Sequence, residues 1–171
     1  RNEAALSRLF ELKGRPPNVP LPVALADGAW AEFWQRQTDE RLWRLAEKWW
    51  PGPLTIVVPA PESTSPVLSA GLGTVALRVP DHELTRRIIK HFGRAVALTS
   101  ANRHGEPPAQ SAEAVCANFS EGLALVVDGG PCALGVPSTL VLLQANACWS
   151  VLRKGGVSEA ELAEVLGPKS R

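Results

Sequence analysis

The sequence contains no methionine, and only three of its 171 residues are cysteine. Without an initiator methionine, we expect the sequence to continue upstream of Arg1, so that the domain is incomplete at its N-terminus. Cys116, Cys132 and Cys148 form no C-x-x-C pair and have no histidine at metal-ligand spacing, which argues against a zinc site. No apolar run approaches the roughly 20 residues that span a membrane, and nothing resembles a signal peptide. We therefore predict a cytoplasmic protein with no membrane contact.

Three common catalytic motifs are also missing. The nearest match to a phosphate-binding P-loop, residues 130–135, is followed by Val136-Pro137 where the motif requires Lys-Ser or Lys-Thr. No Gly-x-Ser-x-Gly segment is present, and the three histidines lack the H-E-x-x-H spacing of a zinc enzyme. The sequence therefore predicts no P-loop, no serine hydrolase and no metal site of its own.

Composition is typical of an ordinary globular protein. The chain is 45% hydrophobic and long enough for the core of one domain but not of two, so we expect residues 1–171 to form a single domain. The formal net charge is only +1, too small to draw the whole protein onto a nucleic acid or an anionic membrane. Any contact with RNA would have to come from a local patch.

The apolar residues alternate irregularly between helical and strand spacing. Helices are predicted over residues 4–12, from a cap at Asp39 to Trp49, from a cap at Asp81 to Ile89, from Ser111 onward, and after a capping box of Ser158 and Glu161. Strands are predicted over residues 54–58, 74–79, 95–98, 123–127, 139–143 and 149–152. Because three strands come in succession near the end, we predict a single-domain α/β fold with an open, twisted, mixed β-sheet and flanking helices.

Two cations lie one residue apart on a loop stiffened by proline. Lys13 and Arg15 flank Gly14, where the helix over residues 4–12 should end. A lysine and an arginine in this arrangement can neutralise neighbouring phosphate oxygens, the arginine through two hydrogen bonds. The alternative is a basic helix end that complements the helix dipole.

Hydroxyl and amide side chains stand next to two predicted strands. Ser100 and Asn102 follow residues 95–98, and Ser138 ends a rigid loop, residues 135–139, at the edge of another strand. Such groups can hydrogen-bond a ligand that lies in the crevice at the end of a strand. Ser100 and Asn102 are equally typical of an ordinary turn.

Two arginines occupy strands or their ends. Thr74 and Arg78 are four residues apart on one predicted strand and therefore face the same side. An arginine that points the same way as the apolar alternates needs an anionic partner, such as a substrate carboxylate or phosphate, whereas one that points to solvent carries no signal. Arg153 lies at the end of the strand over residues 149–152.

Several segments spread over nearly the whole chain resemble the YrdC-like family. No single segment is specific to that family, but the order in which the segments occur is. The segments are Leu12-Lys13-Gly14-Arg15-Pro16, Pro20-Leu21, Trp50-Pro51-Gly52-Pro53-Leu54-Thr55, residues 74–82, Leu98-Thr99-Ser100-Ala101-Asn102, Asp128-Gly129-Gly130, Pro137-Ser138-Thr139 and Val151-Leu152-Arg153. The N-terminal strand and the Pro-Thr-[Glu/Asp]-Thr-x-[Tyr/Phe]-Gly motif with which the family begins are not in the sequence.

The resemblance implies a nucleotidyltransferase, a threonylcarbamoyl-AMP synthase that uses ATP, L-threonine and bicarbonate to begin the N6-threonylcarbamoyladenosine modification of tRNA. It implies that ATP is bound by Lys13, Arg15, Thr74, Ser100, Asn102 and Arg153, with Lys13 and Arg15 catalytic. It implies that L-threonine is bound by Arg78, Ser138 and the backbone near Leu98. Mg²⁺ would be carried by the nucleotide, and tRNA, double-stranded RNA and tRNA-modification proteins are the candidate partners.

Two other functions stay open. The predicted helix after Asp81 carries Arg86, Arg87 and Lys90, with Arg94 just beyond, which would suit a non-catalytic RNA-binding module of the same fold, although such a face is more often simply solvated. Related domains of hydrogenase-maturation proteins form a carbamoyl adenylate instead. Those proteins also carry zinc-finger and acylphosphatase-like segments, and neither is in this sequence.

Overall fold

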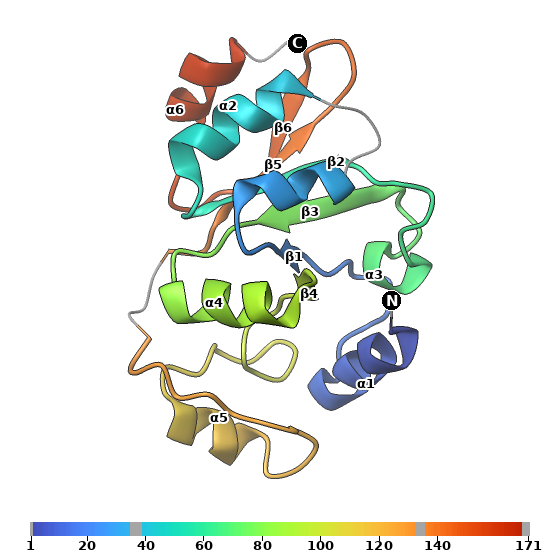
Figure 1. Ribbon diagram of the computed structural model, residues 1–171, viewed down its shortest axis with the longest axis vertical. Helices are drawn as coiled ribbons and strands as arrows, with labels where there is room; N and C mark the ends of the chain where they lie inside the picture. The colour runs from blue at the N-terminus through green and yellow to red at the C-terminus, as the bar shows by residue number, and fades with distance from the viewer. Residues whose placement is uncertain (1, 35–38, 133–135, 169–171) are drawn as a thin grey trace.

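A computed structural model describes residues 2–34, 39–132 and 136–168, and these form an α/β fold around one mixed six-stranded sheet (Figure 1). The strand order is β4-β1-β3-β2-β5-β6. The strands are β1 (Val23–Ala24), β2 (Leu54–Pro59), β3 (Thr74–Arg78), β4 (Val96–Ala97), β5 (Thr139–Leu143) and β6 (Trp149–Arg153). Because β2 pairs parallel with β5 and antiparallel with β3, the prediction of a mixed sheet is confirmed.

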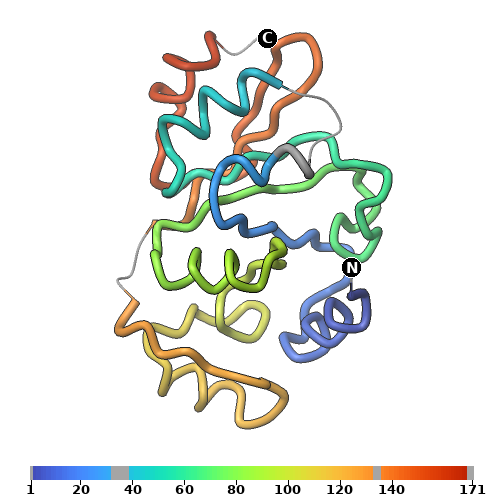
Figure 2. The backbone as a smooth tube through the Cα atoms, viewed as in Figure 1, coloured from blue at the N-terminus to red at the C-terminus, as the bar shows by residue number. Residues whose placement is uncertain are grey.

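The helices flank the sheet and connect its strands. They are α1 (Glu3–Lys13), α2 (Glu40–Trp49), α3 (Pro66–Ser69), α4 (Glu83–Phe92), α5 (Ala112–Asn118) and α6 (Glu159–Leu166), with a 3₁₀ helix, η1, over Gly28–Trp34. Residues 99–132 run below α4, away from the sheet (Figure 2). No helix in the three described ranges is long and apolar enough to cross a membrane.

Local chemistry explains where the helices begin and end. Asp39 and Ser111 cap α2 and α5 through their side-chain oxygens, as predicted. Ser158 and Glu161 form the predicted capping box, which satisfies two N–H groups that the first turn of α6 would otherwise leave unpaired. Helix α1 ends at Gly14, whose φ of 59° is a left-handed conformation that glycine adopts without steric cost.

The core lies around the central strands. Five of the six residues of β2 are buried, and Leu54, Ile56, Leu77 and Val141 have no exposed surface. Each such side chain stabilises the fold by roughly 1.5–3 kcal/mol relative to an exposed position. In β3, Val75 and Leu77 point into this core, so the alternate residues lie half-buried on the opposite face of the sheet.

Several predictions of local structure are wrong. Residues 123–127 form no strand, because no described strand pairs with them, and Leu125 is 78% exposed. The cap of α4 is His82, whose Nδ1 accepts from the N–H of Thr85, and not Asp81. Strand β1 and the short helices η1 and α3 were not predicted from the sequence. They are too brief, or too close to proline and glycine, to produce a periodic pattern.

Candidate functional site

The sheet topology determines where the predicted site residues on its strands lie relative to one another. They lie at two edges of the sheet, meaning the lines where neighbouring strands begin or end. Arg78 ends β3, and Ser138 and Arg153 lie at the start of β5 and the end of β6, all at the same edge. Thr74 begins β3 at the opposite edge; β4 ends level with Leu77, and the chain continues from there in the direction of the Thr74 edge toward Ser100. The two edges are connected by the face of β3 that carries both Thr74 and Arg78, which are about 13 Å apart at 3.3 Å per residue.

Lys13 connects α1 to the loop that follows β4. Its ammonium donates to the backbone carbonyl of Ser100 at 2.5 Å and to that of Asn102, and its side chain is only 4% exposed. Because an ammonium has three N–H donors, one remains available to a ligand. Burial, and after it the charge of Arg15, lowers the pKa of Lys13 below its ordinary value. Lys13 is therefore a confined cation beside a second one.

Arg15 is held by the loop that it begins. Its guanidinium donates to the carbonyls of Val19 at 3.4 Å and Pro20 at 3.0 Å, and burial lowers its pKa. These bonds fix the plane of the guanidinium while leaving other N–H groups unused. Lys13 and Arg15 thus form a pair of oriented cations, as expected from the sequence.

Asn102 is placed differently from what a phosphate contact requires. Its side-chain N–H₂ donates to the carbonyls of Arg103 at 2.8 Å and Glu106 at 2.7 Å, so both amide donors are used within the loop. Its Oδ1 is buried with no hydrogen-bond partner among the described residues. An acceptor cannot bind a phosphate oxygen, so Asn102 in this arrangement shapes the loop that receives Lys13 and offers Oδ1 only to a donor.

At the other edge, a buried serine, Ser138, is bound by Arg153, and Arg78 ends the strand β3 at the same edge. Arg153 donates from Nε and Nη2 to the carbonyl of Ser138 at 3.2 and 2.9 Å, and from Nη2 to its hydroxyl at 3.0 Å. Arg78 donates from Nε to the carbonyl of Gly52 at 3.2 Å, and burial followed by the charge of Arg153 lowers its pKa. Two guanidinium groups close enough to affect each other's charge, with no carboxylate paired to either among the described residues, favour an anionic ligand.

The remaining predicted residues are more loosely placed. Thr74 is half-buried on the same face as Arg78, and Ser100 is exposed with its carbonyl bound to Lys13. The N–H of Leu98 donates to the carbonyl of Pro22 at 2.8 Å, so only its own carbonyl is free to contact a ligand. Gly135, the first residue of the predicted loop at residues 135–139, lies outside the described residues.

Sequence reasoning assigned no role to Thr55 or Gly155, although both hold Ser138. The Thr55 hydroxyl lies 2.7 Å from that of Ser138, and a hydroxyl within an otherwise apolar strand was the available signal. A Cβ on Gly155 would lie 2.1 Å from the carbonyl oxygen of Pro137 and 2.5 Å from the carbonyl carbon of Ser138. The loop bearing Ser138 is therefore packed directly on the Gly155 backbone.

Gly155→Ala is expected to destabilise the protein by about 1–3 kcal/mol, because the backbone of the Ser138 loop has to move to admit a methyl group. Urea unfolding measures the change. Gly28→Ala is the control, since a Cβ there meets nothing within 4 Å, and we expect a change within about 0.5 kcal/mol. Equal unfolding midpoints for the two variants would contradict the close packing at Gly155.

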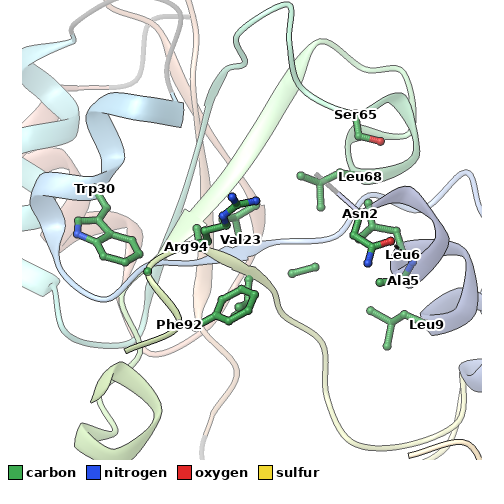
Figure 3. A pocket seen from close by; sticks show the side chains of 14 residues that line it. Asn2, Ala5, Leu6, Leu9, Val23, Trp30, Ser65, Leu68, Phe92 and Arg94 are labelled. Carbon is green, nitrogen blue, oxygen red and sulfur yellow. Dashed lines mark hydrogen bonds between the residues drawn. The ribbon is translucent and has the colours of Figure 1, made fainter. Parts of the chain in front are cut away.

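A cavity of about 750 Å³ lies elsewhere, over the edge of the sheet at β4 (Figure 3). Leu6 and Leu9 of α1 line one side and Trp30 and Phe92 the other, and most of its lining is apolar. None of the predicted site residues lines it. Arg94 is the one cation in this lining, against the two pairs of cations among the predicted site residues, so the cavity is the weaker candidate for a nucleotide site.

The basic residues of α4, the alternative candidate for contact with RNA, are not all free. Arg86 donates to the carbonyl of Pro80 at 2.9 Å and lies 3.7 Å from the Asp81 carboxylate, so it is engaged at the start of its own helix. Arg87 and Lys90 are exposed. Within residues 2–34, 39–132 and 136–168, no three His, Cys, Asp or Glu side chains come together as a metal site.

The chain is similar to proteins from several organisms. A family model described as telomere recombination, which groups Sua5, YciO and YrdC, matches residues 1–155. Threonylcarbamoyl-AMP synthase of Bacillus subtilis is 39% identical over 98% of this chain and 49% of its own length. The synthase of Chromohalobacter salexigens is 41% identical over 85% of this chain and 78% of its own length.

Solved structures show the same relationship. Pyrococcus abyssi Sua5 complexed with L-threonine superimposes with a TM-score of 0.90 at 37% identity, over 97% of this chain and 48% of that one. Full-length HypF in its phosphate- and nucleotide-bound form is 13% identical with a TM-score of 0.74, which shows a shared fold alone.

An α/β fold with two clusters of cations, matched along most of its length by one family, defines the class of the protein. The chain belongs to the Sua5/YciO/YrdC family. It spans about half the length of the Bacillus and Pyrococcus relatives that it matches.

Proposed function

We propose that the chain carries the catalytic site of a threonylcarbamoyl-AMP synthase, which forms threonylcarbamoyl-AMP and pyrophosphate from L-threonine, bicarbonate and ATP. The observation that carries the proposal is the presence of two cationic clusters, Lys13 with Arg15 beside the loop that follows β4, and Arg78 with Arg153 at the ends of β3 and β6. Similarity to synthases at 39% and 41% identity supports it. The product would serve the N6-threonylcarbamoyladenosine modification of tRNA in the cytoplasm.

Each cluster has a separate role in this proposal. Lys13 and Arg15 neutralise the phosphates of ATP, with Thr74, Ser100 and Arg153 as further contacts. Asn102 holds the loop that orients Lys13 and accepts a hydrogen bond from the nucleoside through Oδ1. At the other edge, Arg78 and Ser138 bind the carboxylate of L-threonine, and the Leu98 carbonyl accepts from its amine. The relative solved with L-threonine, at 37% identity, supports the amino-acid half.

The reaction requires positioning and charge neutralisation and no side-chain nucleophile. The amine of threonine adds to the carbon of bicarbonate and water is lost, which leaves a carbamate. A carbamate oxygen then attacks the α-phosphorus of ATP, and the bond to pyrophosphate breaks. Lys13 and Arg15 stabilise the charge that develops on the departing phosphates. Holding the reactants in line across the sheet face supplies much of the remaining acceleration.

Mg²⁺ would be bound by the phosphates of ATP, because the described residues offer no cluster of carboxylates for it. There it would neutralise phosphate charge together with Lys13 and Arg15. Contacts with tRNA and with tRNA-modification proteins are part of the same proposal. The exposed Arg87 and Lys90 on α4 are the candidate contacts for RNA.

Pyrophosphate release tests the proposal. With ATP present, we expect release only when L-threonine and bicarbonate are both added, and L-serine should support it less well. Release supported by carbamoyl phosphate in place of threonine and bicarbonate would indicate a carbamoyl-adenylate enzyme instead. Salt-dependent tRNA binding with no turnover of ATP would indicate the non-catalytic RNA-binding module.

A further inference from the structure

The hydroxyl of Thr55 occupies a central position beneath the proposed threonine site. Thr55 is 2% exposed and lies on β2, one residue before Ile56, which pairs with Leu77. This register sets Thr55 across from Arg78 on the same face of the sheet. On its other side the Thr55 hydroxyl lies 2.7 Å from that of Ser138. Thr55 therefore lies between the two residues proposed to bind the threonine carboxylate.

The direction of the hydrogen bond between these hydroxyls follows from the neighbouring groups. A serine hydroxyl has two acceptor positions and one proton. Arg153 can only donate, and its bond to Ser138 Oγ takes one acceptor position. If Ser138 donated to Thr55, the proton of Thr55 would be buried without an acceptor among the described residues, at a cost of about 1–3 kcal/mol. If Thr55 donates to Ser138, the unpaired proton lies on Ser138 instead, where the carboxylate of the proposed substrate can accept it.

We propose that Thr55 is a positioning residue that makes Ser138 a hydrogen-bond donor toward an anionic substrate group. With both acceptor positions of Ser138 filled by Thr55 and Arg153, the single proton of Ser138 has no protein acceptor in the described residues and is directed at the ligand. A carboxylate oxygen accepts this proton, whereas a donor group in the same place would be repelled. The proposal rests on the proposed function, in which that carboxylate belongs to L-threonine.

The packing of the Ser138 loop makes this alignment rigid. Thr139 donates from its hydroxyl to the carbonyl of Val157 at 2.7 Å and accepts from the N–H of Val157 at 2.9 Å. The carbonyl of Pro137 accepts from Gly156 at 3.1 Å, directly after the close approach at Gly155. Because the backbone on both sides of Ser138 is held, its hydroxyl can adjust only by rotation, and Thr55 determines that rotation.

Thr55→Val tests the proposal, since valine keeps the shape and removes the hydroxyl. We expect KM for L-threonine to rise about 3- to 10-fold, the value of one hydrogen bond, with kcat and KM for ATP changed less than about twofold. Thr55→Ser should restore KM. Thr64→Val is the matched control, because Thr64 is a buried threonine whose hydroxyl has no partner among the described residues, and its KM should stay at the wild-type value.

The outcomes separate this inference from the proposed function. An unchanged KM for threonine in Thr55→Val, in a protein that turns over ATP with threonine, overturns the role of Thr55 and leaves the function standing. If kcat falls, and kcat/KM falls by the same factor whether L-threonine or ATP is varied, the role of Thr55 is merely structural, and the inference is also overturned. Calorimetry of L-threonine with the wild-type chain covers the remaining case, because absence of any binding would overturn the function and the inference together.

Discussion

Lys13→Ala is expected to lower kcat/KM for ATP at least about 100-fold. The substitution removes a confined cation and, with it, the charge-assisted contacts with phosphate oxygens that the proposed function assigns to it in the transition state. It also leaves the carbonyls of Ser100 and Asn102 without their donor, so the free energy of unfolding should fall by about 2–4 kcal/mol. Pyrophosphate-release kinetics and urea unfolding measure the two effects.

A second lysine variant tests whether the loss of activity is specific to Lys13 or follows from the loss of any positive charge. Lys48→Ala removes an exposed lysine that pairs with Glu164 at 3.1 Å between α2 and α6, and we expect activity within about twofold of wild type. An equal loss of activity in the two variants would contradict a special role for Lys13.

The pH dependence of ATP affinity provides a second check on Lys13. Burial, with the charge of Arg15, lowers its pKa, so the folded protein without ligand gives up this proton at a lower pH than the unfolded chain does. The stability contributed by this group therefore rises as pH rises from the lowered pKa to the ordinary one. Bound phosphate requires the ammonium, so ATP affinity should fall over the same window. An affinity that is constant through this window would contradict the contact.

Arg78→Ala has the second largest expected effect, a rise in KM for L-threonine of about 10- to 100-fold. The Arg78 guanidinium is half-buried and lies within the electrostatic influence of Arg153, and the variant would lose its proposed charge-assisted bond to the substrate carboxylate. Because two neighbouring cations repel each other without a ligand, the variant should unfold at the same temperature as wild type or above it. Steady-state kinetics and thermal unfolding test this pair of results.

Arg78→Lys is the conservative control for that position. A lysine keeps the charge but cannot reproduce the planar donor set, including the bond from Nε to Gly52. An intermediate KM is expected. A loss of thermal stability in Arg78→Ala with an unchanged KM would instead identify Arg78 as a structural residue.

Most helices and strands could be predicted from the sequence, because they have long periodic patterns of apolar residues. The buried run in β2 and the capping box of α6 depend on neighbouring residues only, so a local pattern is sufficient to predict both. Residues 123–127 form a continuous apolar run typical of a buried strand, yet a strand requires a partner, and the described strands offer none. Pairing depends on distant residues, which a local pattern does not contain.

In the candidate site, too, features that depend on neighbouring residues could be predicted from the sequence, and features that depend on distant residues could not. Lys13 and Arg15 were found because they are close in sequence, and the structure places them side by side. The hydrogen bonds of Asn102 to Arg103 and Glu106 could not be predicted, because they depend on how one loop closes. Thr55 was missed as a site residue because its partner, Ser138, lies 83 residues away on another strand.

The most direct test of the account follows labelled carbon into product. The chain is incubated with ¹⁴C-bicarbonate, L-threonine and ATP, and the nucleotides are separated and identified by mass. We predict an adenylate that contains the label and threonine in equal amounts, formed together with pyrophosphate and reduced in Arg78→Ala when L-threonine is kept below the KM of the wild type. Labelled bicarbonate that never enters an adenylate, or an adenylate that lacks threonine, would contradict the proposed function.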